Sequence, residues 1–176
     1  ADHFAACCRL EVDLTWWHRI GGSSLTDPSL PIPDGQPPAG QVPSTYVPFR
    51  NANLLAIAVA WAESLGAARV FIGVHAADSA YPDCRPEFVA AFNRVVTLGT
   101  RPGSGLQVEA PLILATKAQI VRRGLELAAP LALTWSCYRQ QDTACGRCDS
   151  CRLRLAAFAE AGQPDPLPYA GQGQSR

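Results

Sequence analysis

Short apolar stretches alternate with longer amphipathic stretches through the middle of this chain. Residues 70–74 form a short apolar and β-branched run that predicts a buried strand, and a second strand is predicted over residues 106–110. The longer stretches predict helices over residues 51–65, 86–98 and 116–128. Strands that alternate with helices in this way are typical of an α/β domain with a parallel sheet.

The ends of these helices carry their own local patterns. Asn51 or Asn53 can cap the start of the first helix, and Gly66 is placed to end it. Thr116 and Gln119 have the spacing of a capping box, in which each side chain bonds the backbone N–H of the other residue. We therefore expect a well-defined start for the helix that follows Thr116.

The outer parts of the chain carry weaker patterns. Residues 3–8 resemble the end of a helix, and residues 9–14 alternate as a short strand does. Residues 21–48 are rich in proline and glycine and predict an irregular, partly extended excursion. A loop this long is more often a lid or binding loop than a passive connection, and a mobile linker is the alternative. A last helix is predicted over residues 152–161, with Gly162 at its end.

Length and composition indicate one globular domain, residues 1–176. Hydrophobic residues make up 48% of the chain and charged residues 17%, which excludes a disordered protein. The longest apolar run, residues 54–62, is about half of a membrane span, so no membrane association is expected. A formal net charge of zero argues against a broad nucleic-acid-binding surface.

Four of the seven cysteines form a cluster with the spacing C-x7-C-x2-C-x2-C. They are Cys137, Cys145, Cys148 and Cys151. A tetrahedral zinc ion needs four sulfurs at about 2.3 Å, and C-x2-C turns supply such ligands, often with a glycine such as Gly146 in the turn. The spacing predicts a closed, structural zinc site, within a zinc-binding C-terminal region of residues 130–162. Clustered thiols also favour the reducing cytoplasm over a disulfide-forming compartment.

An iron–sulfur cluster is the alternative for these cysteines. C-x2-C-x2-C begins the bacterial ferredoxin pattern, in which the fourth cysteine follows after three residues and precedes proline. Here the fourth cysteine comes before the triplet, and Arg152 follows Cys151. Ligand type and spacing favour zinc. Four buried cysteines without any metal are the least favoured interpretation.

The loop after the first predicted strand is rich in groups that bind polar planar ligands. They are Asp78, Tyr81, Asp83, Cys84 and Arg85. Ligands of parallel sheets bind beyond the carboxyl ends of the strands, which is where this loop begins. Carboxylates can accept hydrogen bonds from an amidine-like N–H edge, Arg85 can bind an anion in bidentate fashion, and Tyr81 can stack. The alternative is a solvated turn in which Asp83 caps the next helix.

Anion-binding groups occur at the starts of two predicted helices. Arg50 and Asn51 stand where backbone N–H groups point outward, and Lys117 stands in a first turn, where the helix dipole disfavours a cation. Both positions are consistent with a bound phosphate, although Arg50 could equally be a surface residue before a capping asparagine. The histidines at positions 3, 18 and 75 match no metal spacing, and we interpret them as structural or solvated.

Four segments together resemble one family. They are "VPSTYVPFRN", "GVHAADSAYPDCRPEF", "APLILATKAQIVRRGLEL" and "LTWSCYRQQDTACGRCDSCRLRLAAFAEAG". The chain is similar to the 7-cyano-7-deazaguanine synthase family of queuosine biosynthesis, within the PP-loop ATP pyrophosphatase superfamily. The resemblance implies a Rossmann-like parallel sheet of the adenine nucleotide alpha hydrolase type. It also implies an ATP-dependent C–N ligase that converts 7-carboxy-7-deazaguanine and ammonia to 7-cyano-7-deazaguanine (preQ0), through an adenylated carboxylate and an amide.

The resemblance implies roles for the residues singled out above. The four cysteines would hold a structural Zn²⁺, and ATP would be a co-substrate with Mg²⁺. The loop from Asp78 to Arg85 would hold the deazaguanine, and Arg50, Asn51 and Lys117 would face nucleotide or phosphate. It identifies no catalytic residue. We therefore expect a cytoplasmic enzyme that has no membrane or nucleic-acid partner and that can form a homodimer.

One departure from the family pattern concerns the phosphate-binding loop. The superfamily carries a Ser-Gly-Gly-x-Asp-Ser loop after its first strand, and the 176 residues contain no such sequence and no methionine. We therefore expect an N-terminally truncated chain that is inactive as it stands. Two other functions remain open at this point: a zinc-stabilised nucleotide- or RNA-binding module without catalysis, and a PP-loop tRNA thiolation enzyme with an iron–sulfur cluster.

Overall fold

The structure is a computed structural model, and it describes all residues except 1, 36, 39, 77–79 and 172–176. Its helices and strands in chain order are α1 (Trp17–Ile20), α2 (Arg50–Ser64), β1 (Arg69–Phe71), α3 (Pro86–Gly99), β2 (Gln107–Glu109), α4 (Lys117–Glu126) and α5 (Asp149–Glu160). Single turns of 3-10 helix cover Asp2–Phe4, Pro82–Cys84 and Leu131–Leu133. In the described part of the chain, no helix is both long and apolar enough to span a bilayer.

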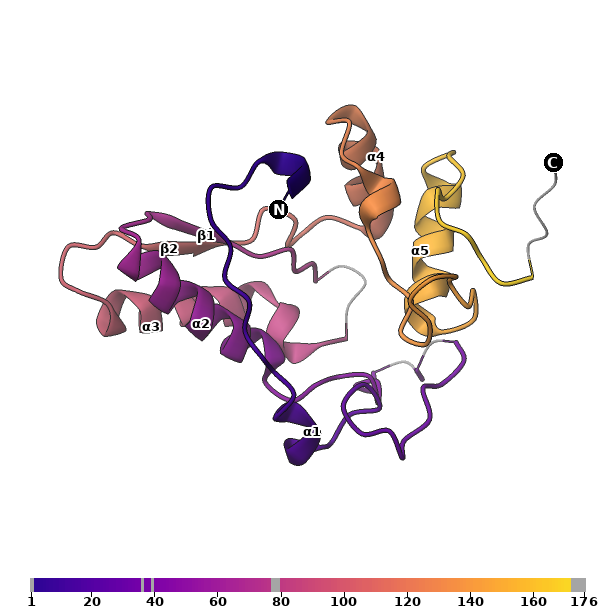
Figure 1. Ribbon diagram of the computed structural model, residues 1–176, viewed down its shortest axis with the longest axis horizontal. Coiled ribbons are helices and arrows are strands. Elements are labelled where there is room, and N and C mark those ends of the chain that lie inside the picture. The colour runs from indigo at the N-terminus through magenta and orange to yellow at the C-terminus, as the bar shows by residue number, and fades with distance from the viewer. Residues whose placement is uncertain (1, 36, 39, 77–79, 172–176) are drawn as a thin grey trace.

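The two strands pair in parallel, and α3 lies in the connection between them (Figure 1). Val70 of β1 is opposite Val108 of β2 at the centre of the register. This confirms the predicted α/β fold with a parallel sheet, although both strands are shorter than predicted. The ladder ends where the N–H of Ile72 donates to the carbonyl of Glu109 (2.9 Å), because residues 73–75 turn to line a cavity.

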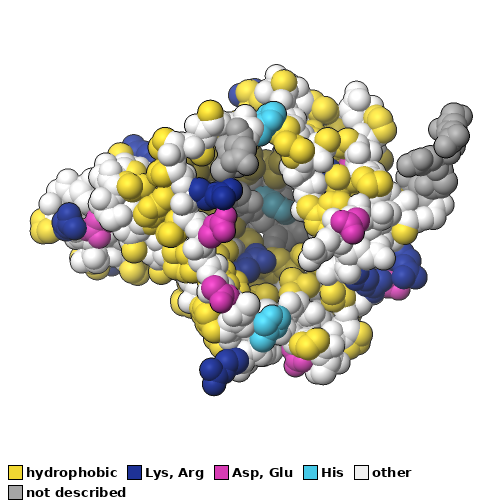
Figure 2. Space-filling view, in the orientation of Figure 1, with side chains coloured by type: hydrophobic (Ala, Val, Ile, Leu, Met, Phe, Trp, Pro, Cys, Tyr) yellow, Lys and Arg dark blue, Asp and Glu magenta, His cyan; other side chains and the backbone are white. Residues whose placement is uncertain are grey.

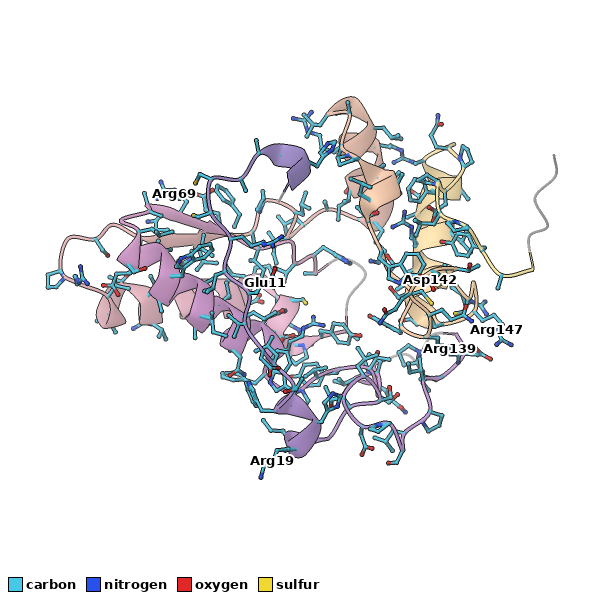
Figure 3. The ribbon with its side chains drawn as sticks, in the orientation of Figure 1. Glu11, Arg19, Arg69, Arg139, Asp142 and Arg147 are labelled. Carbon is cyan, nitrogen blue, oxygen red and sulfur yellow. The ribbon has the colours of Figure 1, made fainter. Side chains whose placement is uncertain are left out.

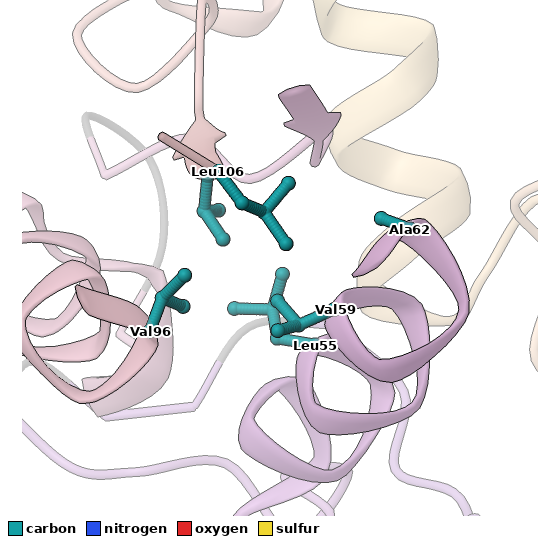
Figure 4. Close-up of a cluster of buried hydrophobic side chains, with 6 residues drawn as sticks. Leu55, Val59, Ala62, Val96 and Leu106 are labelled. Carbon is teal, nitrogen blue, oxygen red and sulfur yellow. The ribbon is translucent and has the colours of Figure 1, made fainter. Parts of the chain in front are cut away.

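The main core lies between the sheet and the two helices that cover it (Figure 4). Its buried side chains come from α2, α3 and β2, together with the residue that precedes β2: Leu55, Val59, Ala62, Val96, Leu106 and Val108. The spacing of the three α2 positions puts them on one face of the helix. Each large aliphatic side chain buried here stabilises the fold by about 1.5–3 kcal/mol.

The helix starts are fixed by two different kinds of contact. The capping box of α4 is confirmed, because Thr116 Oγ1 accepts from the N–H of Gln119 (3.2 Å) and Gln119 Oε1 accepts from the N–H of Thr116 (2.9 Å). The prediction that Asn51 or Asn53 caps α2 is wrong. That helix begins at Arg50, and the N–H of Asn51 donates to the Asp83 carboxylate (3.0 Å), which takes over the capping function.

The N-terminal segment differs most from its prediction. Residues 9–14 form no strand, and Leu10 and Val12 remain about half exposed. An alternating pattern makes a strand only where a neighbouring strand can pair with it, and this segment has none among the described residues. The helix expected over residues 3–8 is reduced to the turn Asp2–Phe4, and α1 was not predicted.

The long loop, residues 21–48, is irregular as predicted, and it is anchored to the cysteine region. Asp34 and Gly35 form isolated backbone bridges with Cys148. Arg139 also forms an ion pair with Asp34 (2.5 Å) and donates to the carbonyl of Ile32. These contacts tie the loop to a segment more than a hundred residues further along the chain.

The C-terminal part is built on α4 and α5, which pack against each other (Figure 1). The α5 helix begins at Asp149, three residues earlier than predicted, because its first turn continues directly from the cysteine turn. A buried ion pair secures the segment after α5: Arg154 donates to both oxygens of Asp165 at 2.7 and 2.9 Å. The Tyr169 hydroxyl donates to the same carboxylate (2.7 Å).

Removing one partner of this ion pair should destabilise the fold. Burial raises the pKa of Asp165, but the hydrogen bonds from Arg154 and Tyr169 lower it by more than burial raises it. The pKa of Asp165 therefore lies below the ordinary 3.8. The pair's stabilisation is therefore present above about pH 4 and is lost as the pH falls through the lowered pKa of the folded state. Asp165→Asn should lower the free energy of unfolding by about 3–5 kcal/mol at pH 7, as measured by urea denaturation.

The matched control is Glu126→Gln, which breaks the exposed ion pair between Glu126 and Arg123. Exposed pairs contribute about 0–1 kcal/mol, so this variant should be nearly as stable as the wild type. Equal stabilities for the two variants would contradict the importance of the buried pair.

Candidate functional site

A cavity of about 800 Å³ lies at the carboxyl end of β1. It is bounded by α2, by the long loop and by the first residues of α4 and α5. The space-filling view shows the molecule hollowed near the middle of the face it presents (Figure 2). The position follows the rule for parallel sheets, whose ligands bind beyond the carboxyl ends of the strands.

The cavity gathers part of the residue set predicted from the sequence. Arg50, Asn51, Tyr81, Cys84 and Lys117 line it. Two other predicted residues, Asp83 and Arg85, do not line it, and Arg85 is exposed. Asp78 lies outside the described residues. Both predicted groups of ligand-binding residues therefore contribute to one cavity, but fewer of their residues line it than the sequence indicated.

Asp83 is engaged by the protein itself. Its side chain is 3% exposed, its Oδ2 accepts from the N–H of Asn51, and its carbonyl accepts from Asn51 Nδ2 (3.0 Å each). The neighbouring Cys84 is also buried, and its sulfur accepts from Asn51 Nδ2 (3.4 Å). These contacts fix the start of α2 against the loop that follows β1, and so hold Arg50 at the cavity.

Hydroxyl groups from three distant segments meet at the cavity wall. The Tyr81 hydroxyl lies 2.8 Å from Thr45 Oγ1 and 3.4 Å from the Tyr138 hydroxyl. The Arg50 guanidinium lies over the Tyr81 ring, 5.9 Å from its centroid. Burial, followed by the contact with Tyr81, raises the pKa of Tyr138 well above its ordinary value, so this hydroxyl stays neutral. The wall is thus polar and aromatic.

A lysine, a histidine and a carboxylate lie together on another side. Lys117, the single lysine of the chain, has its Nζ 3.1 Å from His75 Nε2. The Asp149 carboxylate also lines the cavity, and burial raises its pKa although the charges of Lys117 and Arg152 oppose that shift. His75, which we interpreted from the sequence as structural or solvated, also lines the cavity. Its position directly after the apolar strand was the overlooked indication.

The four predicted cysteine ligands converge. The sulfurs of Cys137, Cys145, Cys148 and Cys151 all lie within 4.8 Å of one another, and all four residues are buried. The Cys145 and Cys151 sulfurs are 4.0 Å apart. Tetrahedral coordination with metal–sulfur bonds of about 2.3 Å requires sulfurs about 3.8 Å apart. The cluster therefore fits a four-coordinate metal ion.

Backbone N–H groups point at two of these sulfurs. The N–H groups of Arg147 and Cys148 donate to Cys145 Sγ (3.4 Å each), and two further N–H groups donate to Cys137 Sγ. Burial raises the pKa of Cys145, but these two backbone donors lower it more, to about 6. Gly146 permits the turn, because its φ of +71° is a left-handed conformation that favours glycine. These donors favour the thiolate of Cys145, the form that binds metal, whereas burial raises the pKa of the Cys151 thiol.

The cysteine cluster also forms one wall of the cavity. Tyr138 follows Cys137 directly, and Asp149 and Ser150 occupy the two positions between Cys148 and Cys151. All three of these intervening residues line the cavity. No pattern in the sequence pointed to them, because the spacing of the cysteines indicates the ligands alone. Arg139, Asp142 and Arg147, labelled in Figure 3, belong to the same region and do not line the cavity.

The residues that build this site match a known family. The family model described as "Queuosine biosynthesis protein QueC" matches residues 2–162. The chain belongs to the QueC family. This confirms the resemblance inferred from the four sequence segments, and the QueC match includes the cavity-lining loops and the whole cysteine cluster.

Relatives of this QueC chain carry one name. The 7-cyano-7-deazaguanine synthase of Chlorobium phaeobacteroides (strain DSM 266) is 52% identical over 170 residues, which are 96% of this chain and 75% of the relative. The synthase of Koribacter versatilis is 54% identical over 172 residues, with 97% and 72% covered. That of Methanospirillum hungatei JF-1 is 49% identical over 170 residues, with 96% and 77% covered.

Loss of one cysteine should release the metal. Cys148→Ser removes a sulfur from a side chain that is completely buried, so the variant should bind less than one metal ion per chain and unfold at a lower urea concentration. Elemental analysis and urea denaturation measure the two effects. Cys7→Ser, at an exposed cysteine outside the cluster, is the control and should change neither. Full metal content in Cys148→Ser would contradict a four-sulfur site.

Proposed function

We propose that this protein makes 7-cyano-7-deazaguanine from 7-carboxy-7-deazaguanine, ammonia and ATP, as a C–N ligase of queuosine biosynthesis. Two kinds of support combine: membership of the QueC family, and relatives named for this product. The single observation that carries the proposal within the molecule is the cavity, which is lined by the cations Arg50 and Lys117 and by the aromatic Tyr81. Such a cavity suits an anionic nucleotide next to a planar base.

The chemistry needs two activations. A carboxylate is a poor electrophile, so its oxygen first attacks the α-phosphate of ATP, and pyrophosphate leaves. Ammonia then attacks the acyl carbon of the adenylate, and AMP leaves with loss of a proton to give the amide. The amide oxygen then attacks the α-phosphate of a second ATP, and pyrophosphate leaves with loss of one N–H proton. Loss of AMP and of the second N–H proton forms the nitrile. The balance is two ATP consumed, and two AMP and two pyrophosphate formed, for each nitrile.

The described residues supply binding and orientation for these steps. Arg50 and Lys117 would offset the negative charge that develops as pyrophosphate leaves. Tyr81 would stack on the deazaguanine ring, held in place by its hydroxyl contact with Thr45. Asn51 would face the nucleotide in an orientation fixed by Asp83. We assign Asp83 a positioning role and name no catalytic acid or base.

We infer that the metal is Zn²⁺ with a structural role. Four sulfur ligands close a tetrahedral site and leave no position for substrate, so no step of the reaction passes through the ion. The ion would instead hold Tyr138, Asp149 and Ser150 at the cavity. The sheet would be of the Rossmann-like adenine nucleotide alpha hydrolase type, and Mg²⁺ would accompany ATP. None of the seven cysteines forms a disulfide in the structure, which supports a cytoplasmic setting.

The test is a product assay with the full-length, metal-loaded protein, because the 176 residues alone lack the family's phosphate-binding loop. Supplied with 7-carboxy-7-deazaguanine, ammonium, ATP and Mg²⁺, it should form the nitrile and about two AMP per nitrile, as detected by mass spectrometry. Omission of ATP should abolish the product. A complete assay without ATP-dependent nitrile would defeat the proposal. A colourless protein with zinc and no iron would also exclude tRNA thiolation through an iron–sulfur cluster.

The single lysine offers an independent test of the nucleotide position. Because Lys117 is the sole lysine, an amine-reactive reagent can label only this side chain and the terminal amine. ATP with Mg²⁺ should protect Lys117 and leave labelling of the terminal amine unchanged, as peptide mass spectrometry can show. Lys117→Met should raise the KM for ATP by about 10–100-fold, the effect of losing one charged contact. Equal labelling with and without saturating ATP would place the nucleotide elsewhere.

A further inference from the structure

One carboxylate lines the cavity among the residues that the structure describes, and it belongs to Asp149. The other candidate carboxylate near the cavity, that of Asp83, is already bonded to the start of α2. Asp149 is the first residue of α5 and directly follows Cys148, so the cysteine cluster fixes its backbone. Among the described residues, the fold therefore holds a single negative group at a fixed place in a cavity that is also lined by the cations Arg50 and Lys117.

One oxygen of the Asp149 carboxylate lacks a hydrogen-bond donor among the described residues. Its Oδ1 is buried and accepts no hydrogen bond from the described part of the chain. A buried carboxylate oxygen without a donor costs free energy, and structures normally supply that donor from the protein, water or a ligand. Oδ1 itself is closed off from the cavity, but Asp149 lines it, so a rotation of the carboxylate toward a bound ligand would supply the missing donor.

We propose that Asp149 recognises the N–H edge of the deazaguanine base and determines the specificity for it. This rests on the proposed function. A 2-amino-4-oxo base presents a ring N–H and an amino N–H side by side, and a carboxylate has two oxygens that accept such a pair in parallel. Tyr81 and Tyr138 supply aromatic surface for the same base. The 7-carboxylate then points away from Asp149, toward Arg50, which lies over the Tyr81 ring on another side of the cavity.

Ammonium is the other ligand that a carboxylate here could bind. Asp149 lies within the electrostatic influence of Lys117 and Arg152, both positively charged. These cations repel ammonium, whereas a neutral N–H edge meets no such repulsion. The structure therefore favours the base over ammonium as the partner of Asp149.

The same contact would exclude the wrong purine. Adenine presents a ring nitrogen acceptor at the corresponding edge and no 2-amino group. Its lone pair would face the carboxylate, and Asp149 would stay without a donor. A site built around a hydrogen bond rejects strongly a ligand that lacks the donor. Asp149 would thus keep the adenine of ATP out of the position meant for the deazaguanine.

The test compares two substitutions within the cysteine region. Asp149→Asn changes the cavity carboxylate, and Asp142→Asn makes the same change at an exposed residue outside the cavity (Figure 3). Calorimetry would measure binding of 7-carboxy-7-deazaguanine, and of its analogue without the 2-amino group, to metal-loaded protein with and without ATP. Asp149→Asn should weaken binding of the 2-amino base on the order of 10- to 100-fold and change binding of the analogue much less. Asp142→Asn should bind both as the wild type does.

Several results would overturn the inference. Unchanged binding of the 2-amino base by Asp149→Asn would do so, and so would equal losses for the two bases. A raised KM for ammonium with an unchanged KM for the base would assign Asp149 to ammonium instead. Should Asp149→Asn lose its metal, Asp149→Ser provides the second variant, since serine is well tolerated at a helix start.

The outcomes also separate this inference from the proposed function. Wild-type protein that binds the base but forms no nitrile would defeat the proposed activity and leave the assignment of Asp149 intact. Wild-type protein that forms nitrile, beside an Asp149→Asn variant with normal affinity for the base, would defeat the assignment alone.

Discussion

Convergence of four sulfur atoms to within 4.8 Å of one another constrains the whole C-terminal third of this protein. Backbone N–H groups surround Cys137 and Cys145, and the turn through Gly146 runs without interruption into α5. The start of α5 is therefore set by the cluster rather than by a capping side chain. The long loop depends on the same cluster, since Asp34 and Gly35 bridge to Cys148.

The cavity is assembled from segments that would not stay together through local structure alone. Asp83 joins the loop after β1 to the start of α2, across 32 residues of sequence. Tyr81 joins that loop to Thr45 on one side and to Tyr138 of the cysteine region on the other. Each joining side chain is bonded within the protein, so the cavity wall is organised before any ligand arrives. Preorganisation of this kind lowers the entropic cost of binding.

Much of this architecture could be predicted from the sequence where the determining contacts are local. The capping box at Thr116 involves residues three apart, and the cysteine spacing is itself the metal-binding pattern. The start of α2 could not be predicted, because its capping carboxylate is Asp83, far along the chain. For residues 9–14 the sequence predicted a strand that does not form. The alternating pattern is present, but no strand among the described residues pairs with it. Tyr138, Asp149 and Ser150 were missed because a ligand pattern says nothing about the direction of the side chains between the ligands.

Asp149 and Ser150 lie between two of the proposed metal ligands, Cys148 and Cys151, and this position limits how the site could change. The number of residues from Cys148 to Cys151 is fixed by the requirement that both sulfurs reach one ion. An inserted or deleted residue there would spoil the coordination and the fold together, whereas exchanging the side chains at 149 and 150 would leave the sulfurs where they are. Metal ligation would thus fix the number of residues between the two cysteines but not the identity of their side chains. New cavity chemistry is accessible here by point substitution alone, which makes these two positions natural targets for redesign.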